Sequence, residues 1–248
     1  MLIVLPPSEG KAESGDGPPV DVAGLGFPAL TPARIRVLDA LTAVCERPDA
    51  QAVLGLPAGR VADIARNRAL RTAATLPAAR LYTGVLYDNL GLATLDAAAL
   101  ARAERRLVVF SGLWGLLRPQ DRVPPYRLSM GVRLPPVGNL AAFWRPAIGE
   151  ILDETPGLVV DMRSTTYAAA WRPGARAVSV RVVRDGKVVS HMAKATRGAL
   201  ARSLLLSDAE PETPEKLARH LADLGYRVEL GPRPRRGESW TLTCQATV

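Results

Sequence analysis

Cysteine and histidine are scarce in this sequence, with two of each among 248 residues. Cys45 and Cys244 lie far apart and form no C-x-x-C pair, which excludes a disulfide-rich scaffold and a cysteine cluster for a metal. His191 and His220 follow no metal-ligand spacing. We therefore expect neither a metal nor a cofactor, and iron binding by the chain itself finds no support in these residue types.

Long apolar runs are also missing. The opening residues 1–5 are apolar, but Pro6 and Pro7 end the run, which is too short for a signal peptide or a membrane span. No later stretch approaches the length of a membrane span. We therefore expect a soluble cytoplasmic protein with no membrane partner.

The charge is strongly positive, with a formal net charge of +8. Lysine occurs only at positions 11, 187, 194 and 216, so arginine supplies almost all of the positive charge. An excess of positive charge favours polyanionic partners. It does not distinguish between nucleic acid, nucleotides and acidic membrane surfaces as the partner. Hydrophobic residues make up 48%, which excludes wholesale disorder.

Strand and helix patterns alternate along the whole length, which predicts one mixed α/β domain over residues 1–248 with flanking helices. Three short apolar runs, 2–5, 107–110 and 157–161, are expected to lie side by side as buried strands. Asp185-Gly186 predicts a hairpin between 176–183 and 187–191. Further strands are expected at 226–230 and 240–243, and helices from Thr31 and over 60–76, 95–106, 140–153, 196–206 and 214–224.

Lys11 follows the first strand in Pro7-Ser8-Glu9-Gly10-Lys11. The segment is not a Walker A motif, because it lacks the second glycine and a following Ser or Thr. Backbone N–H groups and one lysine are still able to hold a phosphate or a carboxylate. The alternative is a solvated turn with a surface lysine.

Two arginine-bearing segments follow the central strand. Residues 111–119 predict a tight hairpin that offers the backbone N–H groups of Ser111 and Gly112 to a DNA phosphate, with Arg118 beside it. Residues 126–133 alternate, so Arg127 lies either on a solvent-facing edge strand or, together with Arg118, on one side of an anion cleft.

Lys194 and Arg197 lie around Thr196, a possible helix N-cap, so helix dipole and side-chain charge together predict an anion site. Arg202 follows about a quarter turn round from Lys194. Farther upstream, Asp161, Ser164 and Tyr167 come at the end of a strand, where they either react with a ligand or cap the next helix.

The string S-G-L-W-G-L-L-R-P with Asp121, followed by P-Y-R-L-S-M-G, closely resembles the signature of the YaaA family. Further matches extend over the whole chain and include Lys11, Tyr167, Lys194, Arg197 and Arg202. The resemblance implies a mixed α/β domain with a basic cleft and a helix-hairpin-helix-like element. It also implies cytoplasmic DNA binding and a role in the response to hydrogen peroxide, linked to limiting free iron.

Two hypotheses stay open. In the first, the protein binds double-stranded DNA through its phosphates with little sequence preference. In the second, it is an enzyme that acts on a nucleotide or nucleobase-containing substrate, with Lys11, Asp161, Ser164, Tyr167 and Lys194 as the catalytic candidates. Both hypotheses expect one cleft to gather five cations, namely Lys11, Arg118, Arg127, Lys194 and Arg197.

Overall fold

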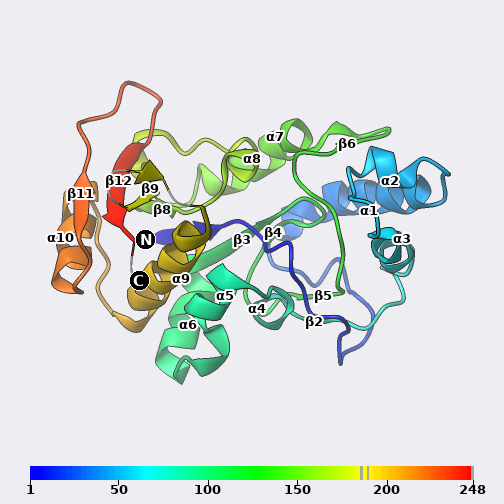
Figure 1. The fold of residues 1–248 in the computed structure, drawn as a ribbon, viewed down its shortest axis with the longest axis horizontal. Helices are drawn as coiled ribbons and strands as arrows, with labels where there is room; N and C mark the ends of the chain where they lie inside the picture. Colours follow the sequence, from blue (N-terminus) through cyan, green and yellow to red (C-terminus); the bar gives the residue numbers. More distant parts are fainter. Residues whose placement is uncertain (185–186, 189, 247–248) are drawn as a thin grey trace.

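A mixed β-sheet forms the centre of the computed structural model, which describes residues 1–184, 187–188 and 190–246. Seven of its strands follow one another in the order β11-β12-β9-β8-β1-β3-β4, and β10 pairs with β9 (Figure 1). The strands are β1 (Leu2–Leu5), β3 (Leu107–Ser111), β4 (Gly115–Leu117), β8 (Val159–Asp161), β9 (Ala177–Arg184), β10 (Lys187–Val188), β11 (Val228–Leu230) and β12 (Trp240–Gln245).

The middle of the sheet is parallel, from β12 through β9, β8 and β1 to β3, while β4 and β11 run antiparallel at its two edges. Every residue of β1, β3 and β8 is buried. Helices cover both faces of a parallel sheet, so its strands are apolar on both sides. The prediction that these three strands lie beside one another in a single mixed α/β domain is confirmed.

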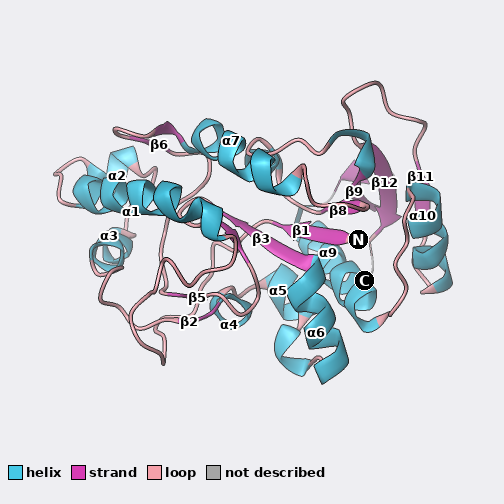
Figure 2. Ribbon diagram, turned by 180° about the vertical axis from the view of Figure 1, so that it is seen from behind, coloured by secondary structure: helices cyan, strands magenta, loops and turns pink. Residues whose placement is uncertain are grey.

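Helices flank the sheet on both sides. In Figure 2, α5, α6 and α9 lie over one face, α7 lies over the other, and α1 to α3 gather at one end of the molecule. Figure 1 shows α8 on the same side as α7. The α-helices are α1 (Thr31–Cys45), α2 (Ala50–Val53), α3 (Val61–Arg68), α4 (Ala78–Leu81), α5 (Val85–Leu90), α6 (Ala97–Arg106), α7 (Leu140–Leu152), α8 (Thr165–Ala168), α9 (Ser190–Leu206) and α10 (Pro214–Asp223). Short 3₁₀ turns within the described residues are η1 (Pro28–Leu30), η2 (Leu92–Thr94) and η3 (Gly174–Arg176).

The expected helix over 60–76 is wrong in its second half, because α3 ends at Arg68. Thr75 bonds to the loop that carries Gly17 and Pro18, and β2 (Leu76–Pro77) then pairs with β5 (Arg122–Val123). Pairing with distant segments therefore overrides the local helical pattern here. A second short ribbon joins β6 (Arg133–Leu134) to β7 (Gly138–Asn139).

The segment around Thr196 also differs from expectation. β10 ends at Val188, and α9 starts at Ser190, so the helix begins before Lys194 and Thr196 is not its N-cap. Thr196 is buried in the interior of α9. The pairing of β9 with β10 is confirmed, whereas the predicted Asp185-Gly186 turn lies outside the described residues.

Candidate functional site

The carboxyl ends of the parallel strands β1, β3 and β8 meet at one edge of the sheet, where ligands bind in many α/β proteins. The loop after β1 brings Lys11 to this edge, and Lys11 forms an isolated antiparallel bridge with Tyr82. Ser111 ends β3 at the same edge. The chain positions the Lys11 backbone through a β-bridge, so its side chain starts from a fixed point.

The Lys11 amine is held against aromatic rings. Its Nζ lies 4.6 Å from the ring centre of Tyr126 and 5.6 Å from that of Tyr82, and it donates a 2.7 Å hydrogen bond to the Ser8 carbonyl oxygen. No carboxylate forms an ion pair with Lys11 within the described part of the chain. The amine is therefore bound by a carbonyl and two π-faces, which stabilise its positive charge less than a carboxylate does.

Burial lowers the pKa of Lys11 from 10.5 to about 8. Removal from water is the main cause, since it penalises the charged amine. The Glu9 carboxylate works in the opposite direction, and the Arg127 guanidinium adds to the depression. A neutral, nucleophilic form of this lysine is therefore accessible near physiological pH.

A chain of hydroxyl groups fixes the rings around the amine. Ser111 Oγ accepts hydrogen bonds from the backbone N–H groups of Leu113 (3.2 Å) and Trp114 (2.9 Å), which occupy its two lone pairs. Its proton is then donated to the Tyr126 hydroxyl at 2.6 Å, and the Tyr126 and Tyr82 hydroxyls share a hydrogen bond of 2.9 Å. Ser111 thereby orients both rings that face Lys11.

Four of the five tyrosines of the sequence gather here, namely Tyr82, Tyr87, Tyr126 and Tyr167. The ring of Tyr87 lies 5.2 Å from that of Tyr82, tilted by 31°, and its hydroxyl donates to the Pro6 carbonyl oxygen. Burial raises the pKa of Tyr167 to about 12 and those of the other three well above 10. These hydroxyls therefore stay neutral at physiological pH and do not serve as bases.

Arg127 lies beside this tyrosine shell on a backbone that is locked in place. Its N–H donates to Asn67 Oδ1 at 2.9 Å, and Asn67 Nδ2 donates to its carbonyl oxygen at 2.8 Å. The guanidinium forms an ion pair with the Glu9 carboxylate and donates to the Glu9 carbonyl oxygen. Arg127 is thus tied to the same loop that carries Lys11.

The neighbouring segment 126–132 is buried on alternate residues but forms no strand, so the edge-strand alternative is wrong.

Lys194 is exposed on α9, which packs closely and in parallel against α5. Arg202 donates to the carbonyl oxygens of Leu90 and Gly91, and a Cβ on Gly198 would meet the Leu86 carbonyl oxygen at 2.1 Å. Lys194 lies one turn earlier along α9 than Gly198, and α5 starts three residues after Tyr82, the bridge partner of Lys11. The side chain of Lys194 is exposed there.

Arg118 does not share this edge, and the expectation of a five-cation cleft is wrong in that respect. Because β4 runs antiparallel to β3, the chain returns Arg118 to the amino end of β3. There it donates to the carbonyl oxygens of Arg105 and Leu107, and it stacks 4.6 Å from the Phe27 ring. The four residue steps of β3 separate that end from Ser111 by about 13 Å.

The side chains of Arg197 and Arg202 form hydrogen bonds to backbone carbonyl oxygens within the fold. Arg197 is half-buried and donates to the Val180 carbonyl oxygen of β9, and its burial lowers its pKa. Arg202 caps the carboxyl end of α5 through its bonds to Leu90 and Gly91. Neither guanidinium extends freely into solvent as an anion-binding group does.

The β3–β4 hairpin is present as expected, but it is buried throughout. Ser111 Oγ accepts hydrogen bonds from the N–H groups of the turn. The backbone at Gly112 is packed so closely that a Cβ there would lie 2.6 Å from the Leu128 carbonyl oxygen. The expectation that Ser111 and Gly112 offer N–H groups to a DNA phosphate is therefore wrong for this conformation. Ser111 instead organises the tyrosines.

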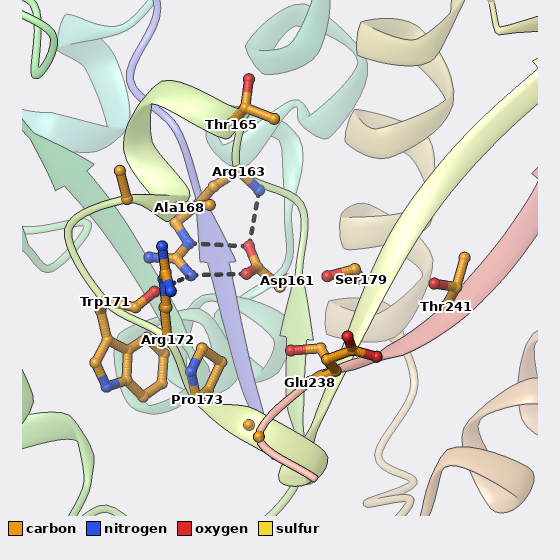
Figure 3. Close-up of a pocket in the computed structure, with 14 residues that line it drawn as sticks. Asp161, Arg163, Thr165, Ala168, Trp171, Arg172, Pro173, Ser179, Glu238 and Thr241 are labelled. Carbon is orange, nitrogen blue, oxygen red and sulfur yellow. Dashed lines mark hydrogen bonds and ion pairs between the residues drawn. The ribbon is translucent and has the colours of Figure 1, made fainter. Parts of the chain in front are cut away.

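Asp161 lies next to a cavity of about 450 Å³ above β8, β9 and β12 (Figure 3). Arg163 is fully buried and binds Asp161 bidentately, with Nε to Oδ1 at 2.9 Å and Nη2 to Oδ2 at 2.7 Å. The guanidinium also lies 4.3 Å from the Phe110 ring and donates to the Trp171 carbonyl oxygen. Both Asp161 oxygens are thus occupied, which disfavours Asp161 as a reacting base.

Ser164 and Tyr167 take different roles from those expected. Ser164 stands at the N-cap position of α8 without a side-chain capping bond, and it is exposed. The Tyr167 hydroxyl accepts a hydrogen bond from the backbone N–H of Met130 at 3.4 Å. Among the catalytic candidates, the fold therefore places Lys11 and Tyr167 near each other. The charges of Glu9 and Arg127 contribute to the pKa shifts of both residues.

Sequence reasoning assigned no role to Tyr82, Tyr87 or Tyr126, the residues that surround the lysine. The available signal was the rarity of tyrosine, with five in the chain. In the part of the chain that the structure describes, no group of three His, Cys, Asp or Glu residues is placed to hold a metal ion. Nor does any described helix have the length and apolar character needed to cross a membrane.

The fold and this edge define a mixed α/β protein with a half-buried lysine in a tyrosine shell at the ends of parallel strands. The family model described as "Peroxide stress protein YaaA" matches residues 1–230. A UPF0246 protein of Streptomyces coelicolor is 50% identical, covering 98% of this chain and 97% of its own length. One from Corynebacterium glutamicum is 42% identical (98% and 99%), and an uncharacterized protein of Campylobacter jejuni is 30% identical (81% and 82%). The chain therefore belongs to the YaaA family of peroxide stress proteins, as its motifs indicated.

Proposed function

We propose that the chain acts in the peroxide stress response by binding the phosphate backbone of DNA with little sequence preference. The contact surface is the basic edge, which we define as Lys11, Arg66, Arg127 and Lys194. Arg66 joins the set because its charge acts on Lys11. The observation that supports the proposal is the proximity of Lys11 and Arg127, which are far apart in sequence but share the Glu9 loop at the carboxyl edge of the parallel strands.

The arrangement of these cations suits backbone contact rather than base recognition. Glu9 and Asp63 partly neutralise Arg127 and Arg66 through ion pairs, and both arginines keep some exposure. A phosphate that approaches the edge competes with these carboxylates for the guanidinium groups. Contacts of this kind hold a duplex in register and carry no direct sequence information.

Salt and mutation test this function. With up to four phosphate contacts, the affinity for duplex DNA is expected to fall about 150-fold between 50 and 200 mM salt, because bound counterions are released. Arg127→Ala and Lys194→Ala should each weaken binding to all duplexes alike and reduce the salt slope by about one. Fluorescence anisotropy with two unrelated duplexes measures both effects.

Lys216→Ala is the matched control, since Lys216 is exposed on α10 and pairs with Glu212 away from the edge. We expect it to leave both affinity and slope unchanged. An affinity independent of salt, a strong preference for one of the duplexes, or equal losses in Lys216→Ala and Lys194→Ala would each contradict the proposal.

A second candidate function is an enzyme that acts on a nucleotide or nucleobase-containing substrate. It is favoured by the Lys11 amine, which is withdrawn from water and has a pKa of about 8. Perturbed lysines of this kind are enriched at catalytic sites. Native mass spectrometry of the purified protein distinguishes the two, since a co-purifying nucleotide that is lost in Lys11→Met supports the enzyme.

A further inference from the structure

We propose that Lys11 is a carbonyl-reactive amine that forms a reversible imine with the aldehyde of an open-chain, phosphate-bearing deoxyribose. This inference rests on the proposed DNA function for one of its two possible sources, an abasic site in a duplex. The other source is a free sugar phosphate. Both present the same chemistry, an aldehyde carbon a few bonds from a phosphate.

The lysines for which the structure describes a side chain differ in kind. Lys216 is exposed and paired with Glu212, and Lys194 is exposed on its helix. Lys11 alone among these three lies over aromatic rings, at 4.6 and 5.6 Å from two ring centres. An amine that is withdrawn from water loses its proton more readily, and this withdrawal is the main cause of the lowered pKa of Lys11.

The protonation state follows from this placement. With a pKa of about 8, roughly a quarter of Lys11 is neutral at pH 7.5, against about one part in a thousand for an unperturbed lysine. The neutral amine is the form that attacks a carbonyl carbon. The surrounding tyrosines stay protonated, because burial raises their pKa values, and they supply polar hydroxyls without adding negative charge.

The neighbouring cations select the rest of the substrate. Arg127 reaches the same loop as Lys11 and presents its guanidinium beside the exposed Glu9 carboxylate. Arg66 adds a second positive charge that acts on Lys11. Planar guanidinium groups near the amine favour an aldehyde that carries phosphate over a neutral aldehyde.

The covalent step balances without a cofactor. The neutral Nζ attacks the aldehyde carbon and forms a C–N bond, and proton transfer from nitrogen to oxygen gives a carbinolamine. Loss of one water molecule, made from the former aldehyde oxygen and two protons, leaves the C=N bond. Hydrolysis with one water molecule regenerates the lysine and the aldehyde.

Borohydride trapping tests the inference. The protein is incubated at pH 7.5 with sodium cyanoborohydride and either a duplex with one abasic site or 2-deoxyribose 5-phosphate, and adducts are located by peptide mass spectrometry. We expect an adduct on Lys11, at least tenfold reduced in Lys11→Arg, which keeps the charge but not the nucleophile. Lys216→Arg, on the exposed face of α10, should retain the Lys11 adduct.

The outcomes separate the inference from the DNA function. An adduct with the abasic duplex identifies DNA as the source, and an adduct with the sugar phosphate alone identifies a small-molecule source. Absence of a Lys11 adduct in both arms, or equal labelling of Lys11 and Lys216, overturns the inference even where an intact duplex binds. Failure to bind an intact duplex, with Lys11 still trapped by the sugar phosphate, overturns the DNA function and leaves the imine chemistry in place.

Discussion

Replacing Asp161 by alanine is expected to lower the free energy of unfolding by about 3–5 kcal/mol, because it leaves the Arg163 guanidinium buried without its counter-ion. The Arg163 side chain has no exposed surface, and two of its nitrogens bind the Asp161 carboxylate. Its remaining acceptors are backbone carbonyl oxygens, those of Tyr167 and Trp171, which carry no full charge. Urea denaturation of the two proteins measures the loss.

Two further variants make this result specific to the ion pair. Asp161→Ala combined with Arg163→Met removes both charges and should recover part of the lost stability, since a buried pair is less costly to replace than to break. Glu238→Ala, an exposed residue of the same cavity, should change stability by less than about 0.5 kcal/mol. If Asp161→Ala lowers stability by under 1 kcal/mol, or the double variant is no better, the pair does not organise this part of the sheet.

Replacing Lys11 by methionine is expected to raise the free energy of unfolding by about 1–3 kcal/mol at pH 7, while abolishing the chemistry proposed for the amine. Burial lowers the pKa of Lys11 from 10.5 to about 8 in the folded state. Below pH 8 both the folded and the unfolded chain carry the proton, so the folded state bears the full cost of a buried charge. Between about pH 8 and 10 only the unfolded lysine binds the proton, so stability rises with pH in this window.

The advantage of Lys11→Met should therefore be largest below pH 8 and should shrink as the pH rises toward 10. Denaturation curves of both proteins at pH 7, 8, 9 and 9.5 measure this difference. Comparing the variant with the parent cancels the titration of the tyrosines, which both proteins share. Lys216→Met is the control, because Lys216 is exposed, and it should show no such convergence. A constant difference across the series would contradict a depressed Lys11 pKa.

The sequence predicted much of the sheet. The apolar runs that became β1, β3 and β8 are buried on both faces, and a strand in that position tolerates little besides Val, Ile, Leu and Phe. The helices α7 and α10 also follow their local signals, with Asn139 and Thr213 accepting the capping hydrogen bonds. Local patterns of this kind act over a few residues and need no information from the rest of the chain.

The segments that were predicted wrongly are those in which distant contacts decide. Leu76 pairs with Val123 instead of continuing a helix, and Thr196 lies inside α9, since that helix begins at Ser190. A capping residue is effective only where a helix begins, and the start of α9 was not visible from Thr196 itself. An anion site was expected around Lys194 and Arg197 at a helix N-terminus. Because α9 starts at Ser190, the helix dipole does not support a site at these two residues.

The sequence by itself determined which side chains are unusual: a single lysine after the first strand, an arginine on a loop, and few tyrosines. Only the tertiary structure decided that Lys11 lies against Tyr82 and Tyr126 and that Arg118 lies at the other end of β3. The physical reason is that a hairpin reverses the chain. β4 carries Arg118 back along the strand whose far end holds Ser111, while parallel pairing carries the ends of β1 and β3 to the same edge.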